Sequence, residues 1–131
     1  MNELAKEILD TVEVGALATV NVDRTPLVTP LHFARLGDSI VWISETTARH
    51  SENAFRNGKA EFVVWDDKKR AVFLKTNVTE LPESEKEAAM AAYKEKLDDF
   101  MPRCQNPQIY VAPIGELDEK TTTGNWLHFI A

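Results

Sequence analysis

The stretch LATVNVDRTPLVTPLHF, residues 17–33, decides the fold. It is rich in β-forming residues on both sides of DRTP, whose residues are typical of a turn, so it predicts a β-hairpin. One face of the first strand, ALATVNV, carries the small and apolar residues Ala16, Ala18, Val20 and Val22. This alternation predicts a half-buried strand. Pro30 removes a hydrogen-bond donor from the second strand, so we expect that strand to lie at a sheet edge or to contain a bulge.

Three helices are predicted around the hairpin. Apolar residues at helical spacing indicate an opening amphipathic helix that stops near Gly15, with the apolar positions Leu4, Ala5, Ile8, Leu9 and Val12. A short helix is expected to begin near Thr47 and to end at Asn57 and Gly58. The longest helix is predicted within residues 81–101, where Ser84 and Glu87 form a capping box. Its apolar side carries Met90, Tyr93, Leu97 and Met101.

Further strands are predicted along the rest of the chain, in the order IVWIS (40–44), EFVVW (61–65), AVFLKTNVTEL (71–81), QIYVAPI (108–114) and NWLHFI (125–130). We find no internal repeat or linker, so we expect one domain over residues 1–131. Six to seven strands in antiparallel hairpin order, with about three flanking helices, predict a mainly β protein of the α+β class. The expected architecture is a small closed or partly closed barrel.

The charge and the composition exclude several classes of partner. The chain has 15 Lys and Arg against 21 Asp and Glu, a net charge of −6, so its surface repels nucleic acid. The N-terminus is charged where a signal peptide needs an apolar core, and no apolar run approaches the ~18 residues of a membrane span. We therefore expect a cytoplasmic protein without a membrane partner. The three histidines, His32, His50 and His128, match no metal-ligand spacing, and no metal is expected.

The stretch TTARHSENAFRNG, residues 46–58, favours a site for one phosphate group. A helix that starts near Thr47 exposes backbone amides and the positive end of its dipole. Thr46 and Thr47 add hydroxyl donors, and Arg49 can form two parallel bonds to an anion. Alternatively, Thr47 only caps the helix and Arg49 is a solvated surface charge. Glu45 favours this alternative, because a carboxylate beside a phosphate is unfavourable unless it points away.

Taken in order, LATVNVDRTPLVTPLHF, IVWIS and TARHSENAFRNGKAEFVVW resemble the flavin-binding split-barrel proteins related to pyridoxamine 5'-phosphate oxidase. The resemblance is strongest over residues 15–81, where all three segments occur at the right spacing. It implies a split β-barrel and a homodimer that binds FMN at the subunit interface. Independently, Trp42, Trp65, Trp126 and the helix predicted within residues 84–101 supply more large apolar groups than so small a barrel needs inside.

The resemblance also implies the cofactor-binding residues. The family's hydroxyl-Arg-Lys phosphate motif falls on Ala48, Arg49 and His50, so only the arginine is retained and the second charge depends on a partly protonated imidazole. Thr47 can replace the lost hydroxyl. Ser44 falls near the ribityl-phosphate chain, and Thr76 replaces a strand glycine. The segment beside the isoalloxazine ring falls on Thr29, Pro30, Leu31 and His32.

The resemblance implies a flavin-dependent oxidoreductase that moves reducing equivalents between a nicotinamide-type donor and a small-molecule acceptor. His32 is the candidate for proton transfer. No arginine follows Arg103, which argues against vitamin B6 oxidation. Trp126 and His128 point to one side of the last strand and could reach the partner's flavin pocket in a dimer, or Trp126 is simply core.

A second hypothesis is that the protein has the same fold but catalyses no reaction. The chain would then be a binding or sensing module for a flavin or a haem. The altered phosphate motif and Glu45 favour this alternative.

Overall fold

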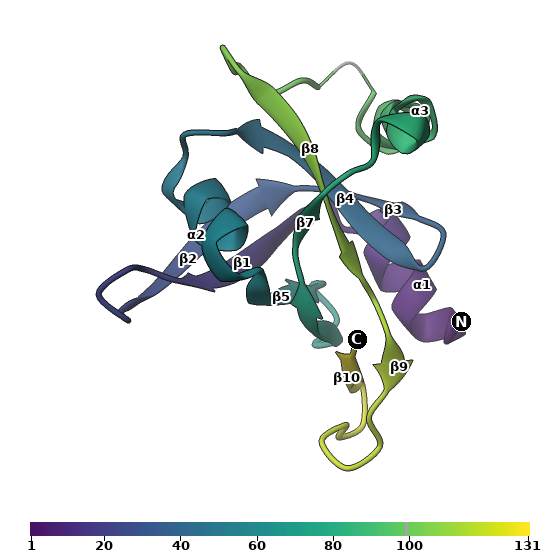
Figure 1. Cartoon of the computed structure of the whole chain (residues 1–131). Helices are drawn as coiled ribbons and strands as arrows, with labels where there is room; N and C mark the ends of the chain where they lie inside the picture. The colour runs from purple at the N-terminus through teal and green to yellow at the C-terminus, as the bar shows by residue number, and fades with distance from the viewer. Residues whose placement is uncertain (99) are drawn as a thin grey trace.

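A computed structural model describes residues 1–98 and 100–131 of the chain (Figure 1). Its elements are α1 (Glu3–Thr11), β1 (Val14–Val20), β2 (Pro26–His32), β3 (Ala34–Leu36), β4 (Ser39–Glu45), α2 (Arg49–Asn57), β5 (Lys59–Trp65), β6 (Ala71–Asn77), β7 (Thr79–Glu80), the 3-10 turn η1 (Glu83–Glu85), α3 (Lys86–Leu97), β8 (Pro107–Pro113), β9 (Glu116–Leu117) and β10 (Trp126–Ile130). The expected α+β class, mainly β and with three α-helices, is confirmed for the described residues. The expected six to seven strands were too few, because β3, β7 and β9 are too short to show a period in the sequence.

The strands form two open sheets that face each other. The six-stranded sheet has the order β2-β1-β5-β6-β10-β9, and the four-stranded sheet has the order β3-β4-β8-β7. All pairings are antiparallel except that of β10 with β6, which is parallel and corrects the expected hairpin order. Residues 78–125 separate these two strands, and a parallel neighbour requires such a long connection.

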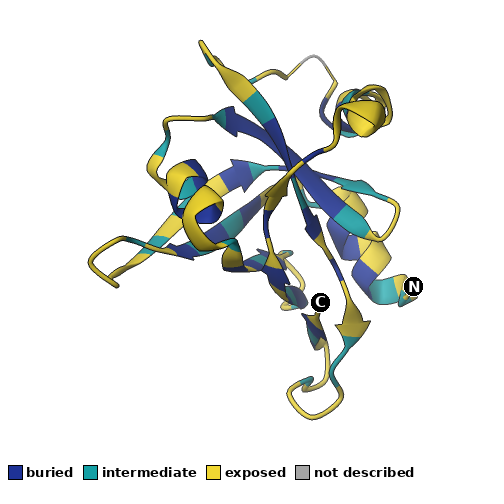
Figure 2. Cartoon of the chain, in the orientation of Figure 1, coloured by how far each residue is buried: buried dark blue, intermediate teal, exposed yellow. Residues whose placement is uncertain are grey.

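The main core fills the space between the sheets, where the strands are buried (Figure 2). Leu17, Phe62 and Leu74 enter it from the six-stranded sheet, and Trp42 and Tyr110 enter it from the four-stranded sheet. The Trp42 ring is stacked on those of Phe62 and Tyr110. Trp42 is almost fully buried in this core, so it is not part of an apolar surplus on the surface.

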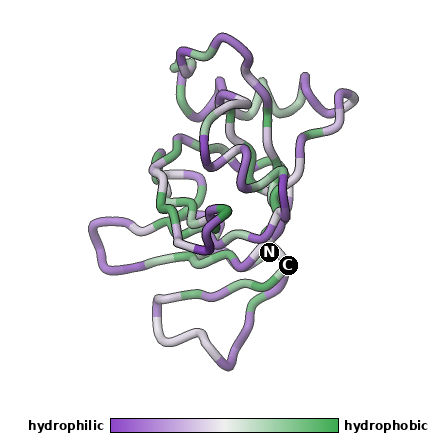
Figure 3. Tube along the Cα trace, turned by 60° about the vertical axis from the view of Figure 1, so that its left-hand side comes forward, coloured by the Kyte–Doolittle hydropathy of each residue, from purple (hydrophilic) through white to green (hydrophobic). Residues whose placement is uncertain are grey.

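Helix α3 covers the other face of the four-stranded sheet. Its buried residues Ala89, Tyr93 and Leu97 pack with Val41 and Ile43 of β4 in a second core cluster. Strand β4 is therefore buried on both faces, which explains why IVWIS reads as a continuous apolar run. Hydrophobic and hydrophilic stretches alternate along the rest of the trace (Figure 3).

The β1–β2 hairpin has the expected turn, with Arg24 at φ 71° between the strands. Its register is continuous from Val14 opposite His32 to Val20 opposite Pro26. Pro30 therefore lies on an edge strand, as expected, but without the bulge that we considered as the alternative.

The buried face of β1 carries Gly15, Leu17 and Thr19, not the alanine and valine face that the alternation suggested. The opposite face of the six-stranded sheet, here called the outer face, carries Ala16, Ala18 and Val20 of β1, Val28 and Pro30 of β2, Val63 and Trp65 of β5, Phe73 and Lys75 of β6, and Trp126, His128 and Ile130 of β10. Several of its large apolar residues are exposed: Val20, Val28, Trp65, Trp126 and Ile130.

The helix ends differ from the sequence pattern by a few residues. Helix α1 ends at Thr11, because Val12 is already extended, and Gly15 lies inside β1. The capping box was wrong: Ser84 lies in η1, and the residue before α3 is Glu85, which makes no side-chain cap. Across residues 1–98 and 100–131, we find no helix with the length and apolar character of a membrane span.

Candidate functional site

The connection from β4 to α2 presents an uncapped helix start. Thr46 and Thr47 lie in an exposed turn, and α2 begins at Arg49 after Ala48, which has no side chain able to cap the helix. Thr47 is therefore not the cap that we weighed as an alternative. Within the part of the chain that the structure describes, no side chain caps this nine-residue helix, so its first-turn amides and the helix dipole favour an anion here.

Arg49 is an exposed cation at this helix start. It lines a hollow of about 500 Å³ between α2 and the β1–β2 turn, together with Arg56, Asp23 and Glu52. Among the described residues, no ion pair engages its guanidinium. The pKa of Asp23 is lowered chiefly by the hydrogen bond from the Thr25 hydroxyl, and Arg49 contributes least to this shift. Arg49 is thus free to bind an anion.

Asn53 holds this part of α2 against β1. Its side chain is buried, and Nδ2 donates to Thr19 Oγ1 and Asn21 Oδ1, both at 3.0 Å. Arg56 donates to Asn53 Oδ1 at 3.1 Å and also to the Val20 carbonyl. These bonds fix the helix, and with it the position of Arg49 one turn earlier.

His50 is half-buried and is directed towards the end of β4. Its Nε2 lies 3.0 Å from Ser44 Oγ, which joins the first turn of α2 to the end of β4. Burial lowers the pKa of His50 below its ordinary value of 6.5. Burial therefore favours the neutral imidazole, so Arg49 is the cation that the retained motif offers.

Glu45 does not oppose an anion at α2. Its carboxylate accepts backbone hydrogen bonds from Gln105 at 2.8 Å and from Asn106 at 3.0 Å. The charge is directed at the loop before β8. This orientation removes the objection that the sequence raised against a phosphate site.

The β2 segment that the resemblance places beside a flavin ring is divided between two faces. Leu31 is buried and lies opposite Gly15, and Thr29 lies opposite Leu17, so both face the core. Pro30 and His32 point to the outer face, where the His32 ring is stacked on Phe100 at 4.0 Å. The four side chains therefore cannot all contact one planar ligand. A ligand beside this edge strand would instead meet its main chain.

Trp126 and His128 share the outer face of β10, as expected. Trp126 is 54% exposed, so it is not a core residue, and its Nε1 donates to the Lys69 carbonyl at 3.3 Å. The His128 ring is stacked on Phe73 at 4.2 Å. In the sheet order, β1, β5 and β6 separate β10 from β2. Within one chain, therefore, Trp126 does not meet the β2 segment.

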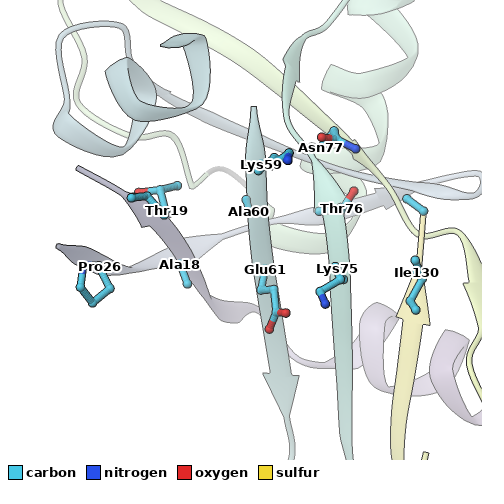
Figure 4. A pocket seen from close by; sticks show the side chains of 12 residues that line it. Ala18, Thr19, Pro26, Lys59, Ala60, Glu61, Lys75, Thr76, Asn77 and Ile130 are labelled. Carbon is cyan, nitrogen blue, oxygen red and sulfur yellow. The ribbon is translucent and has the colours of Figure 1, made fainter. Parts of the chain in front are cut away.

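A second hollow, of about 520 Å³, lies where the ends of β1, β5, β6 and β10 meet (Figure 4). The short side chains of Ala18 and Ala60 leave space there, between Lys59 and Lys75. Thr76, which replaces the family's strand glycine, lines this hollow, but none of the residues that we predicted to bind the cofactor does. The sequence gives little indication of this hollow, because alanine and lysine are common in strands next to turns.

The predicted phosphate-site residues lie at the end of β4, in the turn that follows it and at the start of α2: Ser44, Thr46, Thr47, Arg49 and His50. A hydrogen bond joins Ser44 and His50, whereas Arg49 lines a hollow that none of the other four lines. Uncapped amides, one free arginine and a carboxylate turned away fit a single phosphate group, such as that of FMN. The set does not supply the second cation of the family motif.

The family model described as pyridoxamine 5'-phosphate oxidase matches residues 1–115. No curated protein sequence matches the chain. Many solved structures are similar to this chain, among them the following three. A haem-binding protein from Mycobacterium smegmatis has a TM-score of 0.72 at 21% identity and an F420 reductase has 0.68 at 20%. An FAD-binding protein from Mesorhizobium loti has 0.68 at 19%.

These likenesses differ in how much of each protein they cover. The similarity covers 86% of this chain but only 50% of the haem-binding protein, so this chain spans half of that relative. It covers 85% of this chain and 93% of the F420 reductase, and 88% and 91% for the FAD-binding protein. At these identities, the structures establish the shared fold.

Proposed function

Because this chain belongs to the pyridoxamine 5'-phosphate oxidase family, we propose that it is an FMN-binding oxidoreductase that works as a homodimer. The observation that carries the proposal is the free Arg49 at the uncapped start of α2. Glu45 is turned away from this position, which leaves it suited to one phosphate group. The likeness to flavin-, F420- and haem-binding proteins supports a planar cofactor but does not select FMN among them.

In this proposal, each part of the site has a separate task. The α2 amides and Arg49 bind the phosphate, and His50 holds the Ser44 hydroxyl in place beside it. The edge strand β2 offers main-chain groups to the ring, and His32 is the candidate to hold a proton near it. FMN supplies the electron transfer when bound, so the protein needs no strong acid or base of its own. The donor is a nicotinamide-type molecule and the acceptor is a small molecule.

The homodimer is supported by the outer face of the six-stranded sheet. Trp65 and Trp126 both flank Ala71 on this face and are 55% and 54% exposed. Exposed apolar side chains in one patch are typical of a protein interface. In the proposed dimer this patch is covered by the second copy, and Trp126 and His128 reach the partner's flavin. A sedimentation experiment that finds only monomer would contradict this arrangement.

The first experiment is the absorption spectrum of the purified protein, followed by titration of the apoprotein with FMN. We expect Arg49→Ala to weaken FMN binding about 10- to 100-fold, because a hydrogen bond to a charged group contributes ~1.5–3 kcal/mol. Lys94→Ala is the control, since it removes an exposed positive charge from α3. Colourless protein that takes up no FMN, or equal binding by both variants, would overturn the proposal.

The alternative is a module that holds or senses a flavin or a haem without turnover. The half-buried His50 favours it, because burial favours the neutral imidazole and the site then has less positive charge than the family motif provides. Anaerobic mixing of the FMN-loaded protein with NADH and with NADPH separates the two functions. Bleaching of the flavin band supports the oxidoreductase, and a flavin that stays oxidised with both donors supports the module.

A further inference from the structure

Lys96, in the last turn of α3, and Phe100, shortly after the helix ends, contact two consecutive residues where β2 ends. The Phe100 ring is stacked on the His32 ring, with the centroids 4.0 Å apart and an angle of 28° between the planes. The Lys96 ammonium lies 3.6 Å from the centroid of the Phe33 ring, over its face. Phe33 directly follows β2, so both contacts act on the same short piece of main chain.

Lys96 is itself held in place by α1. Its Nζ donates to the Leu9 carbonyl at 2.8 Å, in the last turn of that helix, where a cation is favourable. Burial lowers the pKa of Lys96 to about 8, although the nearby carboxylates of Asp10 and Glu13 act in the opposite direction. This half-buried amine is held in place by its two partners, the Leu9 carbonyl and the Phe33 ring.

Phe100 is directed to His32 by the way α3 ends. Asp98, which follows the last residue of α3, has φ 55°, an uncommon value for a residue other than glycine. The Phe100 amide then donates to the Leu97 carbonyl at 3.1 Å. Phe100 is 41% exposed, and its ring makes an aromatic stacking contact with His32.

The two contacts approach the end of β2 from different sides. Phe33 is fully buried in the main core and meets the Phe62 ring edge-on at 5.1 Å, whereas His32 points to the outer face. Lys96 therefore contacts the end of β2 through the core residue Phe33, and Phe100 contacts it through His32 on the outer face. Together they leave His32 little freedom to change its orientation.

We propose that Lys96 and Phe100, here called the α3 contact pair, are positioning residues that fix His32 and the end of β2 for the flavin ring. The inference rests on the proposed function, because it assumes that the ring binds along β2. Its physical basis is preorganisation. A strand end that is already fixed loses little conformational entropy when the ligand binds, so affinity is higher.

The test compares FMN binding by Phe100→Ala, Phe100→Tyr and Lys96→Met with that by the wild-type protein. We expect Phe100→Ala to weaken binding about fivefold, in line with the usual contribution of an aromatic pair, and Phe100→Tyr to restore it to within about twofold. Lys96→Met should weaken binding to a similar degree, because it keeps the chain length but removes the cation. Met101→Ala is the control, since this neighbouring side chain is also exposed.

A second readout does not need the cofactor. In the apoprotein, the His32 imidazole signals in an NMR spectrum should move in Phe100→Ala, because the ring current of Phe100 is lost, and should stay near their wild-type positions in Met101→Ala. Unchanged His32 signals in Phe100→Ala would overturn the inference directly.

The outcomes also separate this inference from the proposed function. Wild-type affinity in both Phe100→Ala and Lys96→Met, or a loss in Phe100→Ala that Phe100→Tyr does not restore, would overturn the inference and leave the FMN site intact. A wild-type protein that takes up no FMN would overturn both.

Discussion

The two faces of the six-stranded sheet differ in what covers them, although both are rich in apolar residues. On the inner face, Leu17, Phe62 and Leu74 are almost fully buried against the second sheet. On the outer face, Trp65 and Trp126 remain more than half exposed. Hydrophobic character alone therefore does not identify the core face, and the face without cover is the one that can accept a second copy.

The largest expected difference between the faces is in stability. Phe62→Ala removes a fully buried ring that contacts Phe33 and Trp42, and it should lower the free energy of unfolding by ~3–5 kcal/mol. Phe73→Ala is the matched change on the outer face, and it should cost less than ~1.5 kcal/mol in the monomer. Urea unfolding of both variants measures the difference. Equal losses would mean that the outer face is covered within the single chain.

The next effect concerns association. Trp65→Glu places a charge on the outer face, and we expect it to raise the dimer dissociation constant about 30-fold or more, as at a central interface residue. Phe55→Glu is the control, because Phe55 is 84% exposed on α2, outside the sheet. Sedimentation equilibrium measures the dissociation constant of each. If Phe55→Glu dissociates the dimer and Trp65→Glu does not, the interface lies elsewhere.

The last effect is a pH dependence of stability through Lys96, whose ammonium lies over the ring of the core residue Phe33. The pKa of Lys96 is about 8 in the folded protein against an ordinary value of 10.5, so between these values the unfolded chain holds more protons. The contribution of Lys96 to stability is therefore constant below pH 8 and rises as the pH increases from 8 towards 10.5. We expect the unfolding free energy of the wild type to rise relative to that of Lys96→Met as the pH increases across this range, because the variant lacks the titrating amine. Parallel profiles would contradict the assignment.

Local signals in the sequence predicted much of the fold. The turn DRTP and the β-forming residues around it were enough for the β1–β2 hairpin, and Gly58, at φ 74°, ends α2 as expected. The exposed face of β1 was not predictable, because Ala16 and Ala18 are as apolar as a core requires. What decides their exposure is that β4 and β8 pack on the other side, and these strands are distant in the sequence.

The candidate site was predicted only in part for the same reason. Arg49 lies at a helix start, close to the position that the pattern indicated. The directions of His50 and Glu45 depend on Ser44 and on the amides of residues 105 and 106, which neighbouring residues do not reveal. The contact of Phe100 with His32 joins positions 68 residues apart and left no signal in either segment.

By itself, the amino-acid sequence determined the mainly β class, the hairpin, the three helices and the order of segments that resembles the family. These features depend on turn residues and on periods of two to four residues, which act over short distances along the chain. Only the tertiary structure decided that β10 lies parallel to β6, that Trp42 is buried while Trp65 is exposed, and that His50 turns to Ser44. Those outcomes depend on which distant elements pack together, and packing is a property of the whole folded chain.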